Sequence, residues 1–363
     1  MTSRAIAFLA VLFLAAPAVA QQDTIWLTDG TKKQRVRVTA FDFLKIEFRS
    51  GSNLETLPRE KVLRFVPGQR ALDRYFNKAR KYEADEEFGD AFTSWIGAAE
   101  KLLTNARLRV FAQYAYWRAF DIARSHGKPE DERECLDGLE KKVTNSGYWP
   151  DIWRFRLGLV RNVAAAQKAR KPREKYQARV EQFSKWVEDN NLSERYSIEA
   201  KLFKLDAKTL LAQVSAKQRQ DQLNKLLSEV EGVYPDLATV INLEFAYAVL
   251  AGNKHEDARK LFTTIVNDKA ANSDTKARAY LGRGHAWMSK PGRTSDDARR
   301  ALLDYMRVST LFPKSDAEIV GEALFKAMDA YEAWNGPEKK ANIRRIKSRL
   351  KLRYADSTWA KKR

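Results

Sequence analysis

The chain has 363 residues, and its 66 Lys and Arg against 47 Asp and Glu give a formal net charge of +19. One cysteine cannot form a disulfide scaffold, and 18 Phe, 13 Tyr and 9 Trp supply too much apolar surface for a large disordered protein. Beyond residue 20 no apolar run approaches the roughly 20 residues that cross a bilayer, which excludes a protein with several membrane spans.

The first twenty residues have the pattern of a secretory signal peptide. Arg4 precedes an unbroken apolar run, Ala5 to Ala16, whose twelve residues are too few to span a membrane. Pro17 ends this run, and Ala18-Val19-Ala20 is a small-residue cleavage site. We therefore expect an exported protein, periplasmic or secreted, whose mature chain starts at Gln21. No cysteine lies near the cleavage site, so we expect no lipid anchor.

Residues 21–67 are predicted to form a small all-β module. Its five short strands are expected at Thr24–Asp29, Arg35–Thr39, Ala40–Phe48, Leu54–Leu57 and Val62–Val66. An apolar strand, an Asp-Gly turn, a valine strand, a long bent strand and a short closing strand together resemble the SH3-like and Sm-like barrels. Such barrels often bind ligands or partners, but the regular alternation favours core packing for most aromatic side chains here.

From residue 68 onward the apolar spacing has the helical period. Residues 69–82 and 91–102 carry apolar side chains three and four residues apart on either side of a short turn, which predicts a helical hairpin. Small Ala79 and Ala91 lie where the two helices would cross, and large side chains such as Trp95 would fill the space beside them. This arrangement of small and large residues resembles a tetratricopeptide repeat (TPR).

The same spacing recurs later in the chain, because Ala246 and Ala258 are also twelve residues apart. In between, helices are predicted at Asn105–Ser125, Glu130–Val143, Asp151–Lys168, Arg173–Asp189, Ser193–Val214 and Ala216–Val233. We therefore expect a mainly α protein: a TPR-like helical-hairpin solenoid over 68–336, preceded by the small barrel-like β domain and followed by a basic capping helix and tail over 337–363. Whether 104–234 consists of true repeats stays open.

Residues 235–334, and less closely 69–103, resemble exported TPR proteins of the bacterial cell envelope, whose repeats end in a pattern like Phe312-Pro313-Lys314-Ser315. This resemblance implies a scaffold that binds other proteins, such as components that assemble the envelope. It also implies a concave groove lined by the first helix of each hairpin, in which Tyr247, Arg283 and Trp287 would contact the partner. Packing between repeats is the alternative role for the two aromatic residues.

Residues suited to catalysis or metal binding do not form a recognisable motif. His126, His255 and His285 are far apart in the sequence and have no metal-ligand spacing. Cys135 has no partner thiol, and Gly282-x-Gly284 lacks the lysine of a phosphate-binding loop, so close helix packing is the expected reason for these glycines. We therefore expect no enzymatic activity, no cofactor and no bound metal.

Two stretches carry most of the net charge. Residues 152–185 hold ten Lys or Arg and two Glu, and residues 337–363 hold eleven Lys or Arg and two acids. Such clustering indicates an anionic partner, which for an exported protein is a lipid head group, an acidic wall polymer or an acidic protein rather than nucleic acid. A solvated basic face that aids solubility is the other interpretation.

The last predicted helix, Glu338–Tyr354, has a narrow apolar stripe. Its opposite face carries Arg344, Arg345, Lys347, Lys351 and Arg353. The helix is expected to cap the solenoid, or else to lie on an anionic membrane. Two functions thus remain: an interaction scaffold that binds proteins in a groove, and a peripheral protein that binds anionic lipid or wall polymer through its two basic stretches.

Overall fold

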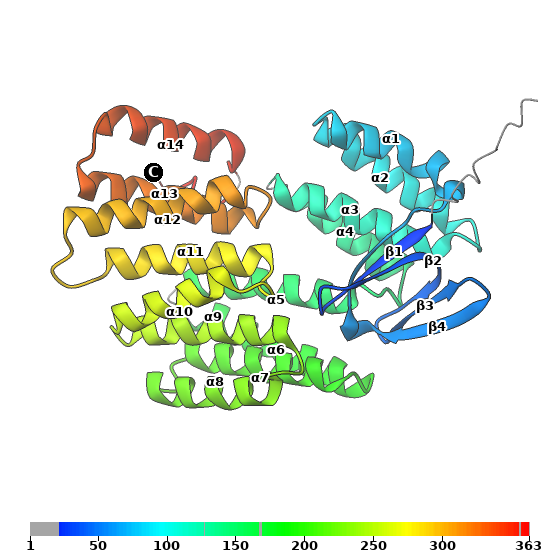
Figure 1. Ribbon diagram of the computed structural model, residues 1–363, viewed down its shortest axis with the longest axis horizontal. Coiled ribbons are helices and arrows are strands. Elements are labelled where there is room, and N and C mark those ends of the chain that lie inside the picture. The colour runs from blue at the N-terminus through cyan, green and yellow to red at the C-terminus, as the bar shows by residue number, and fades with distance from the viewer. Residues whose placement is uncertain (1–21, 127, 167–168, 356, 363) are drawn as a thin grey trace, which may run out of the picture.

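The computed structural model describes residues 22–126, 128–166, 169–355 and 357–362 (Figure 1). The expected signal peptide, 1–20, and the expected mature N-terminus, Gln21, lie outside the described residues. Within them the chain forms five β-strands followed by fourteen α-helices, which confirms the predicted mainly α fold with an N-terminal β module.

The five strands form one antiparallel sheet in the order β4-β3-β2-β1-β5. They are β1 (Asp23–Leu27), β2 (Lys32–Phe41), β3 (Lys45–Ser50), β4 (Asn53–Pro58) and β5 (Val62–Val66). A short 3-10 helix, Arg59–Lys61, links β4 to β5. Alternation sets the two faces of β2, since Val36 and Val38 are buried while Arg37 between them is exposed.

The prediction of a single strand over Ala40–Phe48 was wrong. Strand β2 continues to Phe41, and β3 begins only at Lys45. The turn depends on Asp42, whose carboxylate accepts hydrogen bonds from the backbone N–H groups of Leu44, at 2.8 Å, and Lys45, at 2.9 Å. An aspartate that bonds its own following backbone in this way stabilises a turn, and this signal outweighs the continuous β pattern around it.

The helices stack as hairpins in chain order (Figure 1). They are α1 (Asp73–Ala84), α2 (Phe88–Leu103), α3 (Ala112–Ser125), α4 (Pro129–Lys142), α5 (Trp149–Ala166), α6 (Arg170–Asp189), α7 (Glu194–Leu210), α8 (Ala216–Val230), α9 (Pro235–Ala251), α10 (His255–Asn267), α11 (Ser273–Met288), α12 (Ser295–Leu311), α13 (Ala317–Trp334) and α14 (Lys339–Arg353). No helix among the described residues is long and apolar enough to cross a bilayer.

The predicted helix crossings hold at the first hairpin. Ala79 and Ala91 are fully buried, and Trp95 lies beside them with its ring 5.0 Å from that of Phe76. The six central helices are also present. The helix predicted to begin at Arg173 begins earlier, at Arg170, so Pro172 lies in the first turn of α6. A proline is tolerated there because its missing N–H would have no helical partner.

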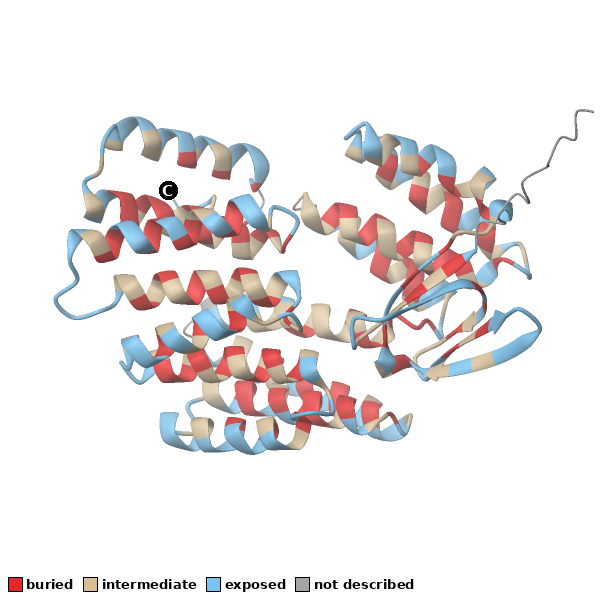
Figure 2. Ribbon diagram, viewed as in Figure 1, coloured by how far each residue is buried: buried red, intermediate tan, exposed pale blue. Residues whose placement is uncertain are grey.

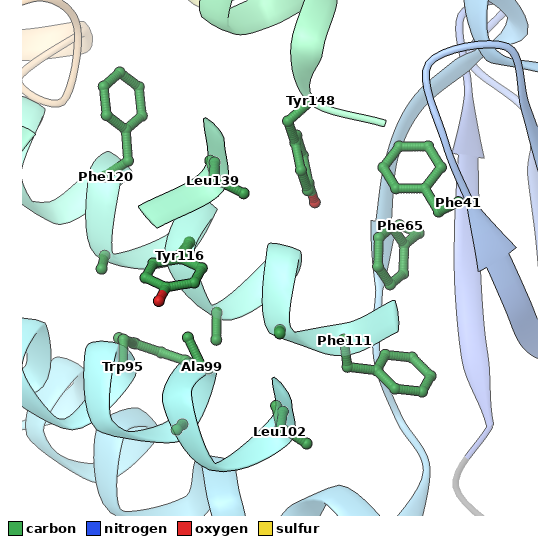
Figure 3. Packing of buried hydrophobic residues seen from close by; sticks show 14 of the residues in the cluster. Phe41, Phe65, Trp95, Ala99, Leu102, Phe111, Tyr116, Phe120, Leu139 and Tyr148 are labelled. Atoms are coloured by element: carbon green, nitrogen blue, oxygen red, sulfur yellow. The ribbon is translucent and has the colours of Figure 1, made fainter. Parts of the chain in front are cut away.

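The stack of helices is interrupted once. Consecutive helices pack closely along the whole array except α4 and α5. The segment between these two helices packs against the sheet instead: the ring of Tyr148 stacks on Trp117 at 4.6 Å and meets the ring of Phe41 at 5.4 Å. Figure 3 shows Tyr148 beside Phe41 and Phe65 of the sheet. The sheet therefore contacts the connection between α4 and α5, at which the helical array is broken.

The sheet and the first helices share one hydrophobic core. It runs from Ile25 in β1 through Phe65 and Phe111 to Ile152 in α5, all of which are buried (Figure 2). On the far side of the break, Phe43 follows β2 and packs edge-on against Trp186 of α6 at 5.7 Å. The sheet thus contacts helices on both sides of the break and connects them.

A buried arginine joins the sheet to the helices. Arg59 donates hydrogen bonds to the carbonyl oxygens of Val62 and Gly147 and to the carboxylate of Asp151, with which it forms an ion pair at 2.5 Å. Beside it, the Gln113 side chain donates to the Phe41 carbonyl at 2.9 Å and accepts from the Gly147 N–H at 2.9 Å.

The array also curves back on itself. Arg124, near the end of α3, lies 2.7 Å from Asp274 in the first turn of α11 and 3.7 Å from Asp316, the N-cap of α13. Figure 1 shows the end of α3 beside the C-terminal helices. Glu132 of α4 faces the same junction, and burial, followed by the negative charge of Asp316, raises its pKa to about 7.

Replacing Arg59 by alanine is expected to destabilise the protein by about 3–5 kcal/mol, because the change leaves Asp151 and two carbonyl oxygens without their buried partner. Urea unfolding measures this loss. Arg37→Ala, on an exposed position of β2, is the matched control and should change the free energy of unfolding by less than about 0.5 kcal/mol. Equal effects of the two changes would contradict the role given to Arg59.

The junction around Arg124 predicts a pH dependence. Because the pKa of Glu132 rises on folding from 4.5 to about 7, the unfolded chain releases this proton first, and stability falls as pH rises from about 4.5 to 7 and levels off above. Glu132→Gln should remove about 1–2 kcal/mol of that fall, a value reduced for solvent screening. Burial raises the pKa of Asp121 to about 6, so this residue should still contribute to the fall in stability with pH in the Glu132→Gln variant. Urea unfolding from pH 5 to pH 8 tests this; an unchanged pH profile in the variant would contradict it.

Candidate functional site

An open hollow of about 580 Å³ lies between α10, α11 and α12. We call it the arginine hollow. Its lining residues are Arg259, Lys260, Thr263, Arg283, Trp287, Arg300, Leu303, Asp304 and Arg307. The helical period explains why they converge, since each helix contributes side chains three, four or seven residues apart, which lie on one face.

Stacking against aromatic rings holds the arginines in place. Trp287 has the guanidinium of Arg259 3.8 Å and that of Arg300 5.0 Å from its ring centre. Two turns earlier on α11, the ring of Tyr280 has Arg283 at 5.1 Å and Arg307 at 5.8 Å. Each ring therefore fixes two cations, one or both of them on a neighbouring helix.

Asp304 is the one acid that lines the hollow. Its buried carboxylate accepts two hydrogen bonds from Arg283, at 2.7 and 2.9 Å, and lies 2.9 Å from Arg307. One negative charge thus orients two arginines and leaves the hollow with an excess of positive charge. Arg300 pairs with Asp296 at 2.8 Å outside the hollow, where both side chains are about half exposed, so this pair is weakened by solvent.

Two of the three predicted groove residues, Arg283 and Trp287, come together in this hollow. The TPR resemblance placed them on the side formed by the first helices, whereas the walls of the hollow are the second helices, α10 and α12. Tyr247 does not line it. Its hydroxyl donates to the Arg278 carbonyl at 2.8 Å, its ring packs on Phe262 at 5.0 Å, and burial raises its pKa. Tyr247 therefore packs between repeats.

The sequence analysis missed Arg259, Arg300 and Arg307 as members of the site. They belong to different helices from Trp287, and nothing in the chain order shows that they would meet it. The only signal was their position: Arg300 and Arg307 are seven residues apart and must share one face of a helix.

Three of the ten basic residues of the stretch 152–185 form ion pairs with other helices. Arg154 forms a bidentate ion pair with Glu199, and Arg161 pairs with Asp206 at 2.7 Å. Arg156 pairs with Glu140. These acids belong to other helices and are distant in the sequence. The stretch therefore does not present all of its charge to solvent.

The C-terminal helix keeps its basic face. Ile346, Leu350 and Tyr354 are buried in the core formed with α13, as the capping interpretation requires. The predicted basic residues lie on the other side: Arg344, Arg345, Lys351 and Arg353 are exposed and Lys347 is half-buried. In the described part of the chain only Arg345 among them has a carboxylate nearby, that of Glu338 at 3.8 Å.

His285, His126 and Cys135 contact neighbouring side chains and backbone groups within the fold. His285 lies 3.0 Å from the Tyr305 hydroxyl and 3.3 Å from Glu322, while His126 contacts the Ile122 carbonyl at 2.8 Å. Cys135 is buried, which raises the pKa of its thiol. Within the described residues, no group of three or more His, Cys, Asp or Glu side chains is placed to hold a metal ion.

No protein-family model matches the chain, and no curated protein matches it. Solved structures with similar parts include a putative kinesin light chain from Podosopora anserina with nearly identical TPR-like repeats. It shares 14% identity and a TM-score of 0.35, and the match covers 54% of this chain and 97% of that one. BtubC (BKLC) from P. vanneervenii has 13% identity and a TM-score of 0.37, with 73% and 91% covered.

The two glycines of α11 sit where neighbouring rings press against the helix that carries the site. A Cβ atom on Gly282 would lie 2.4 Å from the Phe262 ring, and one on Gly284 would lie 2.4 Å from the Tyr305 ring. Gly282→Ala or Gly284→Ala should therefore lower the free energy of unfolding by about 1–3 kcal/mol in thermal or urea unfolding.

The matched control for these two glycines is Gly97→Ala. Gly97 lies inside α2, and an added Cβ there meets no atom within 4 Å. This change should stabilise the protein by about 0.5–1 kcal/mol, because alanine is the better helix former. Equal stability of all three variants would show that α11 is not packed as closely as described.

Proposed function

We propose that this protein is a non-catalytic, exported scaffold of the bacterial cell envelope that binds a partner protein in the arginine hollow. The observation that carries the proposal is the hollow itself: an open site on three packed helices, lined by arginines and a tryptophan whose positions are already fixed by stacking. Arginine and tryptophan are the residues that most often dominate protein interfaces.

Preorganisation supports binding of a macromolecule at this site. The side chains that would contact a partner are held by Trp287, Tyr280 and Asp304, so little side-chain freedom is lost on association. Leu303 on the same surface is 50% exposed and offers an apolar contact next to the cations. A site of this kind offers a partner both charged and apolar recognition groups.

Export and envelope location rest on the sequence, through the signal-peptide pattern of residues 1–20 and the TPR resemblance. The β module contributes differently. The strand order and the 3-10 helix before β5 support a small barrel of the SH3-like kind. Its core is shared with the helices and its loops contact α5 and α6. We therefore assign the module a structural role in bracing the array.

Site-specific photo-crosslinking tests the scaffold function. A photoreactive amino acid replaces Leu303, in the hollow, and the full chain is expressed in a bacterial envelope that processes it. A discrete protein adduct is expected at this position. The control position is Leu352 on α14, which is 80% exposed and outside the hollow. Absence of adducts at residue 303, or the same adducts at residue 352, would contradict binding in the hollow.

A second function is favoured by one observation, the basic face of α14. Lys340, Arg344, Lys347 and Lys351 follow one another at spacings of three and four residues, so they form one stripe, and no described carboxylate pairs with them. A peripheral contact with an anionic lipid surface fits this stripe. The alternative contact with a wall polymer would use the same charges.

Vesicle sedimentation tests the stripe. The protein should bind vesicles containing phosphatidylglycerol at low salt, be released at high salt, and leave pure phosphatidylcholine vesicles unbound. Replacing the four basic residues by glutamine should lower binding on the order of 100-fold or more, at about 1 kcal/mol for each charge. The control replaces four exposed basic residues of β2, Lys32, Lys33, Arg35 and Arg37, by glutamine. Binding that resists salt, or that survives the α14 changes, would contradict this function.

A further inference from the structure

The spacing of cations in the arginine hollow indicates the shape of its occupant. The two stacks on α11 are centred on Tyr280 and Trp287, seven residues apart. A rise of about 1.5 Å per residue separates them by roughly 10 Å along the helix axis. Arg300 and Arg307 on α12 have the same separation, so cations gather at two positions roughly 10 Å apart.

The free donors at these positions suit carboxylates. A guanidinium has five N–H donors in a planar fork that matches the two oxygens of a carboxylate. Arg307 lies near Asp304 through one terminal nitrogen and has a side chain that is 48% exposed, and the side chain of Arg300 is 54% exposed. Both therefore keep donors that face solvent. Stacking restricts their orientation without using those donors.

An extended chain matches the hollow in the spacing of its side chains. The guanidinium groups of Arg259 and Arg300, on the two walls, lie 3.8 and 5.0 Å from the centre of the Trp287 ring. In the polyproline II conformation residues i and i+3 lie on the same side, roughly 9 Å apart, which matches the two cation positions.

We infer that the arginine hollow binds an extended acidic segment of the partner protein, in which two carboxylates three residues apart meet Arg300, beside Trp287, and Arg307, beside Tyr280. This inference rests on the proposed function and specifies the chemistry of the partner. One carboxylate replaces water at the Trp287 stack, the other at the Tyr280 stack, and the apolar side chain of Leu303 contacts the chain between them.

Synthetic peptides test the spacing directly. The probe is a fluorescent peptide, Gly-Ser-Glu-Gly-Ser-Glu-Gly-Ser, titrated with the full mature chain at low salt by fluorescence polarisation. It is compared with the glutamine version, with an isomer whose glutamates are adjacent, and with an alanine-rich helical peptide whose glutamates are seven residues apart. The spaced peptide should bind at least about tenfold tighter than the glutamine version, since each charge-assisted contact contributes about that factor. It should also bind more tightly than the other two.

Variants of the protein assign the binding to the hollow. Arg259→Gln with Arg300→Gln should weaken peptide binding at least about tenfold. The control is Arg299→Gln, which removes the same charge one residue away, from a side chain that pairs with Asp296 and does not line the hollow. Circular dichroism checks folding. If the double variant does not fold, Arg307→Gln, at a partly exposed position, should show the same weakening.

Peptide binding and crosslinking distinguish a failure of the acidic-segment inference from a failure of the scaffold function. Equal affinity for the spaced and glutamine peptides, a preference for the helical peptide, or unchanged binding by the hollow variants would each overturn the inference about an acidic extended segment. If a crosslinker at residue 303 still captured a discrete protein in that case, the scaffold function would stand with a partner of another chemistry. If that crosslinker captured nothing while the spaced peptide bound as expected, the site chemistry would be right and the envelope scaffold wrong.

Discussion

The guanidinium of Arg59 is the contact on which the arrangement of sheet and helices depends. It is a buried charge, and burying a charge is favourable only when its donors are satisfied. Arg59 satisfies them by joining three parts of the chain: its own strand connection, the loop between α4 and α5, and Asp151 at the start of α5. Because that loop lies where the helical stack is interrupted, the sheet and the interruption form one structural feature.

This feature sets the course of the array. The sheet packs against helices on both sides of the break, through Gln113 of α3 on one side and Trp186 of α6 on the other. The later hairpins then curve until α11 and α13 meet the end of α3 at Arg124. A solenoid normally has contacts only between neighbouring repeats, so both contacts across the array restrict its flexibility. The arginine hollow lies away from the break, on α10 to α12, which pack against one another in chain order.

Charge is used in two ways along the chain. In the first half of the helical region arginines such as Arg154 and Arg161 pair with buried acids and hold helices together. In α10 to α12 Arg283 and Arg307 share one acid, Asp304, and Arg300 pairs with the half-exposed Asp296. The arginines of the hollow also rely on aromatic rings for their orientation. Pairing with buried acids neutralises the arginines of the first half, whereas stacking on aromatic rings leaves the charge of the hollow arginines available to a ligand. Composition does not distinguish them, because both consist of arginine-rich helices.

The sequence by itself determined most of the local structure: four of the five strands, nearly all helix positions and the small residues at the crossing of Ala79 and Ala91. These follow from period, turn residues and side-chain size, which act over a few residues. It also pointed to Arg283 and Trp287. Only the tertiary structure decided that Tyr247 is a packing residue and that Arg259, Arg300 and Arg307 complete the hollow. It also decided that three arginines of the stretch 152–185 pair with acids of other helices. The reason is physical. Ion pairs and cation–aromatic contacts depend on distances between helices. Those distances depend on the packing of the whole array, including the β-sheet that contacts the helices on both sides of its break.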